Sequence, residues 1–560
     1  MSKILLSVIA CLLLFAFIGF KKATKTKPKD NRPNIIIIMA DDLGYSDLGC
    51  YGSEISTPNI DQLAAQGIRY TRFYNTSRCC PTRASLLTGL YNQRAGIGNM
   101  TEASDEPGYL GHLAENSVTL AEVLKSAGYH TAMSGKWHVS NTPGQKNAGE
   151  QLKWLNHQSY HSEFSPVEQY PTNRGFEKFF GTIWGVIDFF DPFSLVNGTR
   201  PVKTVPDNYY HTDAINDTAA AYIRQYSKDD KPFFLYVAHN APHWPLMALP
   251  EDIAKYKDTY KVGWDSIRAA RYRKLVKFGI VDPAKAPLSP SQGNDLKWAD
   301  NPNKEWDAAA MAVHAAMIDR MDQGIGRIIK ALKETGRLEN TLIVFLSDNG
   351  ASNENCTAYG PGFDRPSQTR DGRQIVYDMK KQVLPGKETS YASIGQRWAN
   401  VANTPYRYWK AESYEGGVRT PMIAFWPKGI RAKKGSLSNQ LGHVKDFMAT
   451  FVELAKTSYP KIYKGRPVIP SQSNSIANSF KNKPSAEQPL FNEHYDARYV
   501  RFNGWKLVSA VGDTTWHLYN INNDETEVNN VATKYPAQVK QLSNMWHSWA
   551  INNKVYPKPH

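Results

Sequence analysis

The sequence is poor in cysteine: it has five in 560 residues, and their spacing matches neither a metal-binding motif nor a disulfide framework. Cys11 lies in an N-terminal apolar run, which leaves Cys50, Cys79, Cys80 and Cys356 for the folded part. The chain also lacks a dense stripe of Lys and Arg and has no tandem repeats, which argues against nucleic-acid binding and a repeat architecture. The composition is otherwise globular and rich in Tyr and Trp, which excludes the disordered and fibrous classes.

Part of the net charge of +15 lies ahead of the fold, since residues 1–32 contribute +6 of it. The remaining +9 favours an anionic partner only weakly. Lys3 and the apolar run 4–20 predict an export signal peptide or an uncleaved N-terminal anchor over residues 1–20, followed by a basic linker over 21–32. We therefore expect a protein exported to the periplasm or the extracellular space, with a membrane tether if the segment is retained.

The length exceeds one compact core and predicts two domains. Over residues 33–455, short β-branched runs alternate with amphipathic helices, a pattern typical of an α/β domain whose sheet has helices on its faces. A polar stretch rich in Ser, Pro and Asn then leads to short alternating strands and a closing helix over 537–552. We expect a smaller C-terminal α+β domain with a short antiparallel sheet over residues 456–560.

Two pairs of oxygen-bearing side chains come directly after expected buried strands. Asp41 and Asp42 follow the first strand, and Asp348 and Asn349 follow a later one. Ligands of open α/β sheets bind at the carboxyl ends of strands. Adjacent carboxylates repel each other unless a cation lies between them, and hard cations prefer oxygen ligands. Either pair alone could be a solvated turn, but the two together predict one shared cation.

The segment that starts Cys79-Cys80-Pro81 predicts a helix that begins at Cys79 and stops at Gly89. Cys79 then lies at a helix N-terminus, where free amides and the helix dipole favour negative charge. Arg83 lies one turn further on the same face. An inert buried cysteine is the alternative for an isolated Cys-Cys-Pro, whereas the whole arrangement predicts a spot that suits an oxyanion.

Further polar candidates follow other strands. Lys136 and His138 come after the expected strand 129–133 and project to the same side if the backbone is extended. His239 and His243 lie in the proline-containing segment after the strand 232–238, and either could be structural.

The string Cys79-X-Pro81-X-Arg83, with Ala84 next and Thr88-Gly89 at its end, resembles the signature of type I sulfatases. The resemblance extends from about Asn34 to the C-terminus, and segments 33–52, 241–256, 398–421 and 505–528 look like bacterial arylsulfatases of the alkaline-phosphatase superfamily. It implies a mixed, mostly parallel central sheet flanked by helices, as in alkaline phosphatase. It also implies that Cys79 is oxidised to formylglycine (3-oxoalanine) by a formylglycine-generating enzyme.

By the same resemblance, a single Ca²⁺ ion is expected on five residues, namely Asp41, Asp42, Asp348, Asn349 and the modified Cys79.

The resemblance also implies roles for five basic residues around that ion. Arg83 matches the residue that holds the formylglycine hydrate, and Lys136 and Lys410 match sulfate-binding lysines. Lys410 by itself would be a surface residue. His138 matches the residue that assists regeneration of the aldehyde, and His243 the one near the leaving oxygen, which is why His243 is preferred to its neighbour.

These roles imply a sulfuric ester hydrolase that cleaves sulfate monoesters, with a sulfated carbohydrate as the expected substrate. Trp137, Trp184, Trp244 and Tyr359 are candidates for an aromatic rim that suits a sugar or an aryl ring. The segment 493–498 departs from the His-Glu-Gly-Asn-like string that is frequent in the family. Two alternatives stay open: a phosphomonoester or phosphonate-ester hydrolase of the same superfamily, and a catalytically silent glycan-binding relative with an unmodified cysteine.

Overall fold

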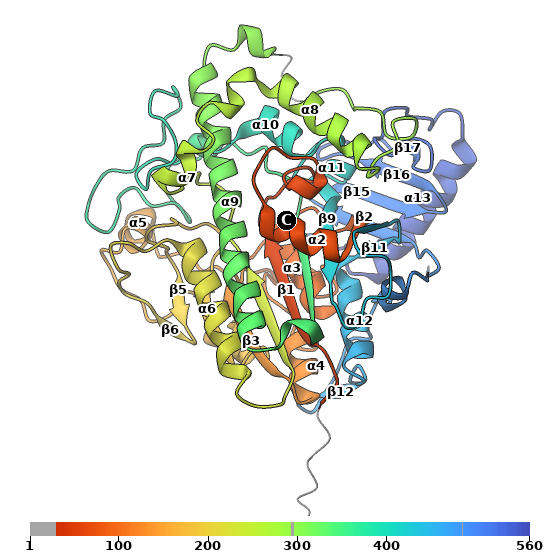
Figure 1. Ribbon diagram of the computed structural model, residues 1–560, viewed down its shortest axis with the longest axis horizontal. Coiled ribbons are helices and arrows are strands. Elements are labelled where there is room, and N and C mark those ends of the chain that lie inside the picture. Colours follow the sequence, from red (N-terminus) through yellow and green to blue (C-terminus); the bar gives the residue numbers. More distant parts are fainter. Residues whose placement is uncertain (1–29, 293–295, 484, 560) are drawn as a thin grey trace, which may run out of the picture. The chain divides into compact units, whose positions relative to one another are not determined.

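The computed structural model describes residues 30–292, 296–483 and 485–559, and from Arg32 onward the chain forms one compact unit (Figure 1). The predicted segment 1–20 lies outside the described residues, as does the linker 21–32 except for its last three residues. Among the helices of the described ranges, none combines the length and the apolar character needed to cross a membrane.

An 11-stranded sheet forms the centre of this unit. Strand β1 (Asn34–Ala40) is paired in parallel with β7 (Phe233–Ala238) on one side and with β8 (Thr341–Ser347) on the other. Beyond β7 the parallel order continues through β3 (His130–Gly135) and β4 (Lys178–Thr182).

The other half of the sheet is mixed. Strand β9 (Arg419–Phe425) runs antiparallel to β8 and also to β2 (Ile68–Tyr74). Short strands complete both edges, namely β5 (Leu195–Asn197), β6 (Arg200–Pro201), β10 (Ser436–Ser438) and β11 (Gly442–His443). The predicted fold class, a mixed and mostly parallel sheet flanked by helices, is confirmed.

The two faces of β1 belong to two different hydrophobic cores, because alternate side chains of a strand point to opposite sides. Ile36 and Ile38 pack in the core that contains the helices α2 (Pro58–Gln66), α6 (His211–Tyr226) and α9 (Lys304–Glu334).

Ile35 and Ile37 pack in the opposite core, with α3 (Cys79–Thr88), α4 (Leu120–Ser126) and α12 (Phe447–Leu454). Helices therefore cover both faces of the sheet (Figure 1). This double burial explains why the first strand is an unbroken apolar run rather than an alternating one.

One predicted strand starts earlier than expected. The sequence predicts a strand after Pro421, at 422–426, but β9 begins at Arg419 and includes the proline. Proline can occupy a strand at an irregular position. The register of the β2–β9 pair shifts between Tyr70 and Phe73, opposite Pro421, so no regular ladder hydrogen bond is lost there.

The C-terminal part forms its own four-stranded antiparallel sheet, as predicted. Its strands are β14 (Leu490–His494), β15 (Ala497–Phe502), β16 (Trp505–Ser509) and β17 (His517–Asn520). The closing helix α13 (Pro536–Asn552) packs on this sheet through Trp546. The domain boundary expected at residue 455 stays a prediction.

Candidate active site

Backbone hydrogen bonds connect the ends of four strands at one edge of the sheet. The amide of Asp348 donates to the carbonyl of Ala40 at 3.1 Å, and the amide of Lys136 donates to the carbonyl of Ala238 at 2.7 Å. The amide of Asp41 donates to the carbonyl of Ala241 at 3.1 Å. The polar residues that follow β1, β3, β7 and β8 therefore converge on one place although they are far apart in the sequence.

Asp41 and Asp348 are fully buried, and both contact Arg83. The Lys136 ammonium lies 2.5 Å from Oδ2 of Asp41, and the Arg83 guanidinium lies 2.7 Å from Oδ2 of Asp348 and 3.4 Å from Oδ2 of Asp41. Burial alone would raise both carboxyl pKa values, but the charges of Lys136 and Arg83 hold the pKa of Asp41 below its usual value. Burial and the charge of Asp41 raise the pKa of Asp348.

Arg83 thus contacts the carboxylates rather than the thiol of Cys79. Its Nε and NH2 groups both donate to Asp348, and its NH1 group donates to the carbonyl of Lys136 at 3.0 Å. The side chain joins helix α3 to the ends of β3 and β8. Arg83 belongs to the predicted cluster, but it acts on the acidic residues directly.

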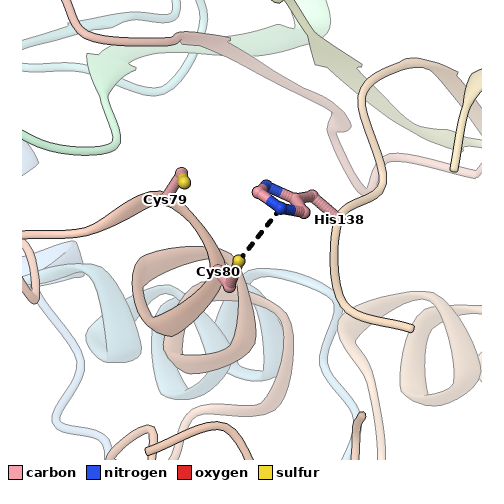
Figure 2. A group of neighbouring side chains, drawn as sticks. All are labelled: Cys79, Cys80 and His138. Carbon is pink, nitrogen blue, oxygen red and sulfur yellow. Dashed lines mark hydrogen bonds between the residues drawn. The ribbon is translucent and has the colours of Figure 1, made fainter. Parts of the chain in front are cut away.

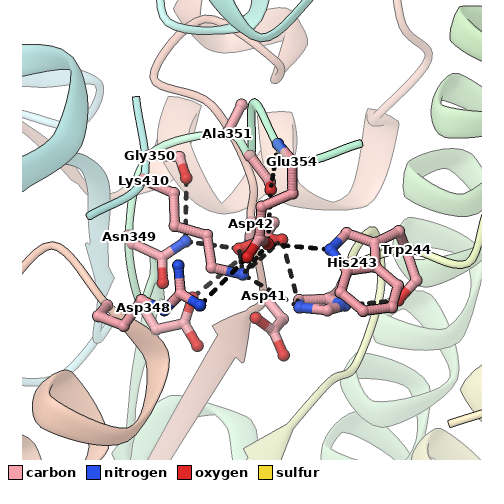
Figure 3. A network of polar contacts seen from close by, with 12 residues as sticks. Asp41, Asp42, His243, Trp244, Asp348, Asn349, Gly350, Ala351, Glu354 and Lys410 are labelled. Atoms are coloured by element: carbon pink, nitrogen blue, oxygen red, sulfur yellow. Dashed lines mark hydrogen bonds and ion pairs between the residues drawn. The ribbon is translucent and has the colours of Figure 1, made fainter. Parts of the chain in front are cut away.

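Asp42 and Asn349 form the second half of the cluster (Figure 3). The Asn349 amide donates to Oδ1 of Asp42 at 2.6 Å. The Lys410 ammonium lies 3.0 Å from both carboxylate oxygens of Asp42. Asp42 has a φ of 63°, a left-handed conformation that Asp tolerates better than most residues and that turns its side chain into the site.

The donor set of this cluster fits a hard divalent cation. Oδ1 of Asp41 and Oδ1 of Asn349 are buried oxygens with no hydrogen-bond partner among the described residues. Three carboxylates and one amide oxygen of this kind are the ligands that Ca²⁺ prefers. Buried oxygens without a hydrogen-bond partner are costly, and a bound cation would coordinate them.

Cys79 is the first residue of helix α3, as the sequence predicts, and its side chain borders a cavity of about 290 Å³. The neighbouring Cys80 is fully buried, and its Sγ lies 3.3 Å from Nε2 of His138 (Figure 2). Interaction with the Cys80 thiol and the charge of Lys136 lower the pKa of Cys79 well below its ordinary value, against the effect of burial.

His138 is held tightly against this cysteine pair. It has a φ of 54°, and the Cβ of any larger residue in place of Gly185 would lie 2.3 Å from its Cε1 atom. Burial and the charge of Lys136 lower the pKa of His138 to about 4. The imidazole is therefore neutral near pH 7 and can accept a proton.

His243, rather than His239, lies in the site. Its Nδ1 is 2.5 Å from the carbonyl of Trp244, so Nδ1 carries the proton and Nε2 is the acceptor. The Lys410 ammonium lies 3.0 Å from that Nε2. Burial and the charge of Lys410 lower the pKa of His243, whereas the pKa of Lys410 is raised by Asp42 and Glu354 despite burial. His239 is buried away from the cavity lining.

Five charged residues of the cavity wall were not identified from the sequence, namely Arg78, Glu102, Glu354, Asp364 and Arg365. Glu354 accepts from the indole Nε1 of Trp244 at 2.9 Å, and its carboxylate lies 3.1 Å from both Lys410 and Arg78. Glu354 follows the Asn349-Gly350 turn by only a few residues, and Arg78 directly precedes Cys79. Proximity to a predicted site residue was therefore the one signal available for both.

Of the four aromatic rim candidates, three border the cavity. Trp184, Trp244 and Tyr359 line it, together with Phe363 and with Tyr495 from the divergent segment 493–498.

The prediction that Trp137 belongs to the aromatic rim was wrong. Its side chain is fully buried, its Nε1 donates to Ser140 and to the carbonyl of Gln169, and it is not part of the cavity lining. It follows Lys136 by one position, so it points to the other side of the strand end and packs in the core.

The sheet order and the acidic cluster at the carboxyl ends of its strands are those of an alkaline-phosphatase-like hydrolase. The family model described as Sulfatase matches residues 33–457, and one described as N-sulphoglucosamine sulphohydrolase, C-terminal, matches residues 406–550. The chain therefore belongs to the type I sulfatases of the alkaline-phosphatase superfamily, and it is a sulfuric ester hydrolase.

Individual relatives agree with this assignment. A sulfatase of Schizosaccharomyces pombe is 32% identical over 97% of both chains. The arylsulfatase of Klebsiella aerogenes is 34% identical over 80% of this chain and 92% of its own length. Among solved structures, Ps i-CgsB in complex with k-i-k-neocarrahexaose has a TM-score of 0.63 at 24% identity and covers 93% of each chain, which shows the shared fold.

Proposed function

We propose that this sulfatase cleaves sulfate monoesters with a formylglycine made from Cys79 and one Ca²⁺ ion held by Asp41, Asp42, Asp348 and Asn349. The observation that carries the proposal is the pair of orphaned oxygens, on Asp41 and Asn349, in a buried cluster beside the N-terminus of α3. When bound, the ion supplies positive charge for a sulfate oxygen, and the hydrated formylglycine supplies an attacking hydroxyl.

The cations of the chain bind and orient the sulfate group. Lys136 contacts Asp41 and Lys410 contacts Asp42, so both would offer an ammonium group to a sulfate bound at this cluster. Arg83 lies behind them and fixes Asp348 and Asp41. Fixed charges in a dehydrated pocket stabilise the transition state more than mobile water does.

His138, His243 and Lys410 carry out the proton transfers. Departure of an alcohol requires a proton at the leaving oxygen, and the Lys410–His243 pair holds one between Nζ and Nε2 at the cavity wall. His138 lies on the other side, beside Cys79, and is neutral because of its low pKa. It is placed to accept the proton that a hydroxyl at position 79 must lose.

We also propose a sulfated carbohydrate as the substrate, a formylglycine-generating enzyme as the maturation partner, and export from the cytoplasm. The apolar run 4–20 after Lys3 supports export, with retention of that run as a membrane tether. The aromatic side chains that line the cavity support a ring-shaped substrate. The similar fold of Ps i-CgsB, solved with neocarrahexaose, supports a saccharide.

The test replaces Cys79 with Ala in the full chain and uses Cys50→Ala as the matched control, because Cys50 lies outside the cavity lining. We expect loss of sulfate ester hydrolysis in the first variant alone, with unchanged thermal unfolding in both. Mass spectrometry of the peptide that contains Cys79 should show the lighter aldehyde in active enzyme. Hydrolysis by Cys79→Ala, or an unmodified thiol in active enzyme, would contradict the proposal.

Comparison of matched sulfate and phosphate esters separates the proposal from a phosphoester hydrolase. We expect the sulfate ester to have the higher kcat/KM. A higher value for the phosphate ester would favour that alternative.

A further inference from the structure

The cavity beside Cys79 has three permanently charged cations on its wall, and each is already paired with a carboxylate of the same wall. The lining contains Arg78, Arg365 and Lys410, with Glu354 and Asp364 as their partners. No cation of the described lining residues is left without a carboxylate partner. Because these charges are already compensated by carboxylates, the wall attracts an anionic group beyond the sulfate only weakly.

Glu354 holds two of these cations at once. Its Oε1 lies 3.1 Å from Arg78, and its Oε2 lies 3.1 Å from Lys410. The Glu354 side chain is 13% exposed, so water replaces these partners poorly. The charges of Lys410 and Arg78 outweigh the effect of burial and hold the pKa of Glu354 well below its usual value. A substrate anion that took Arg78 would leave part of this carboxylate unpaired, which is costly at a buried site.

Arg365 is held in a similar way on the other side of the cavity. Its NH1 lies 2.6 Å from Asp364, with both side chains 16% exposed, and its Nε donates to the carbonyl of Gly360 at 2.8 Å. The guanidinium also lies over the ring of Tyr359, 5.4 Å from its centroid. The charge of Arg365 is therefore already compensated by Asp364, and two of its donor groups are engaged by Asp364 and Gly360.

One further charged side chain lines the cavity, and it is the negatively charged Glu102. Glu102 is exposed at the cavity wall and forms no ion pair with any of the residues that the structure describes. Its carboxylate repels a second anionic group of a substrate. Tyr359 and Phe363, 47% and 44% exposed, offer apolar faces instead.

We propose that this cavity selects esters in which the sulfate is the only anionic group, carried by an otherwise uncharged ring, and discriminates against rings that also bear a carboxylate or a second sulfate. The inference rests on the proposed function, in which Lys410 and Lys136 receive the one sulfate. A further anion would have to share Arg78 with Glu354 or Arg365 with Asp364, where it meets a carboxylate beside each cation, and it would face Glu102.

The test compares isosteric ligands that differ in one charge. 4-Carbamoylphenyl sulfate and 4-carboxyphenyl sulfate are the aryl pair, and methyl galactoside 2-sulfate and methyl galacturonoside 2-sulfate are the sugar pair. Dissociation constants are measured by calorimetry with Ca²⁺-loaded Cys79→Ala protein, in which no turnover is expected. We expect the neutral ring to bind about tenfold or more tightly than its carboxylate partner, a difference of about 1.4 kcal/mol. The ring type that binds more tightly identifies an aryl or a sugar substrate.

Two variants in the same background locate the cause. Asp364→Asn removes the carboxylate partner of Arg365 and should reduce the ratio of the two dissociation constants, carboxylate ester over neutral ester, about fivefold. Glu102→Gln should also reduce this ratio, and it changes an exposed residue rather than a buried one. Asp371→Asn removes the same charge from an exposed carboxylate outside the cavity and should leave the preference unchanged.

The inference is overturned if the carboxylate esters bind as tightly as the neutral ones, if no ester binds, or if Asp364→Asn and Glu102→Gln both behave like Asp371→Asn. Turnover by the unmutated enzyme is measured separately. If the neutral esters bind more tightly but the unmutated enzyme does not turn over sulfate esters, the proposed function is contradicted and this inference is not. If the enzyme turns over sulfate esters but shows no preference between them, this inference is contradicted and the proposed function is not.

Discussion

Arg83 and Asp348 form a fully buried ion pair across 265 positions of the sequence, with NH2 of the guanidinium 2.7 Å from the carboxylate Oδ2. The same guanidinium reaches Asp41 at the end of β1, so one side chain of α3 connects two strand ends. Ion pairs of this kind specify geometry, and they become a liability when one partner is removed.

We predict that Arg83→Met destabilises the protein by about 3–5 kcal/mol and abolishes hydrolysis, because two buried carboxylates lose their shared cation. The free energy of unfolding is measured by chemical denaturation. The control is Arg373→Met. The Arg373 side chain is 53% exposed, so its replacement should change the free energy of unfolding little. Equal effects of the two variants would contradict the prediction.

Removal of Ca²⁺ should lower both activity and thermal stability, since an ion that binds only the folded state stabilises it by about 2.7 kcal/mol at 100 times its dissociation constant. The unfolding temperature is measured with Ca²⁺ and with a chelator. Asp348→Asn should reduce the Ca²⁺-dependent shift, whereas the exposed Asp207→Asn should retain it. An unfolding temperature that does not respond to Ca²⁺ in the parent protein would refute calcium binding.

Gly185→Ala should lower kcat about 10- to 100-fold, because the added methyl group meets the ring of His138 and displaces it, and this overpacking should cost about 1–3 kcal/mol of stability. Gly144→Ala is the matched control, since its Cβ would have no neighbour closer than 4.0 Å. Steady-state kinetics on a sulfate ester provide the measurement. Unchanged kcat in Gly185→Ala would show that the position of His138 does not limit the rate.

Asp188 should make stability depend on pH. Burial raises its pKa to about 8, although its carboxylate accepts hydrogen bonds from the amides of Phe190 and Asp191. The unfolded chain loses this proton near pH 4, so the folded state binds one proton more between pH 4 and pH 8. This contribution to stability is complete below pH 4. It decreases by up to about 1.4 kcal/mol per pH unit as the pH rises from 4, and it is lost once the pH has passed 8.

Asp188→Asn keeps the acceptor oxygen and removes the titration. We expect the variant to gain stability relative to the parent as the pH is raised from 5 to 8, measured by urea unfolding at each pH. Asp207→Asn serves as the exposed control with no such trend. A stability difference that is constant with pH would disprove the assignment to Asp188.

The local pattern of the sequence was sufficient to predict the strand ends and the start of α3. Asp41 and Asp42 follow an unbroken β-branched run, and proline after Cys79 and Cys80 marks the first turn of a helix, because both signals act over a few neighbouring residues. The family signature around Cys79 supplied the roles that spacing alone left open, including the choice of His243 over His239.

Only the tertiary structure decided which side chains meet. Arg83 turns to the carboxylates, Trp137 is packed in the core, and Glu354 connects Lys410 with Arg78. These relationships depend on strand order and on contacts between residues hundreds of positions apart. A pattern of hydrophobic and polar residues specifies which face of an element is buried, but it does not specify the element that packs there.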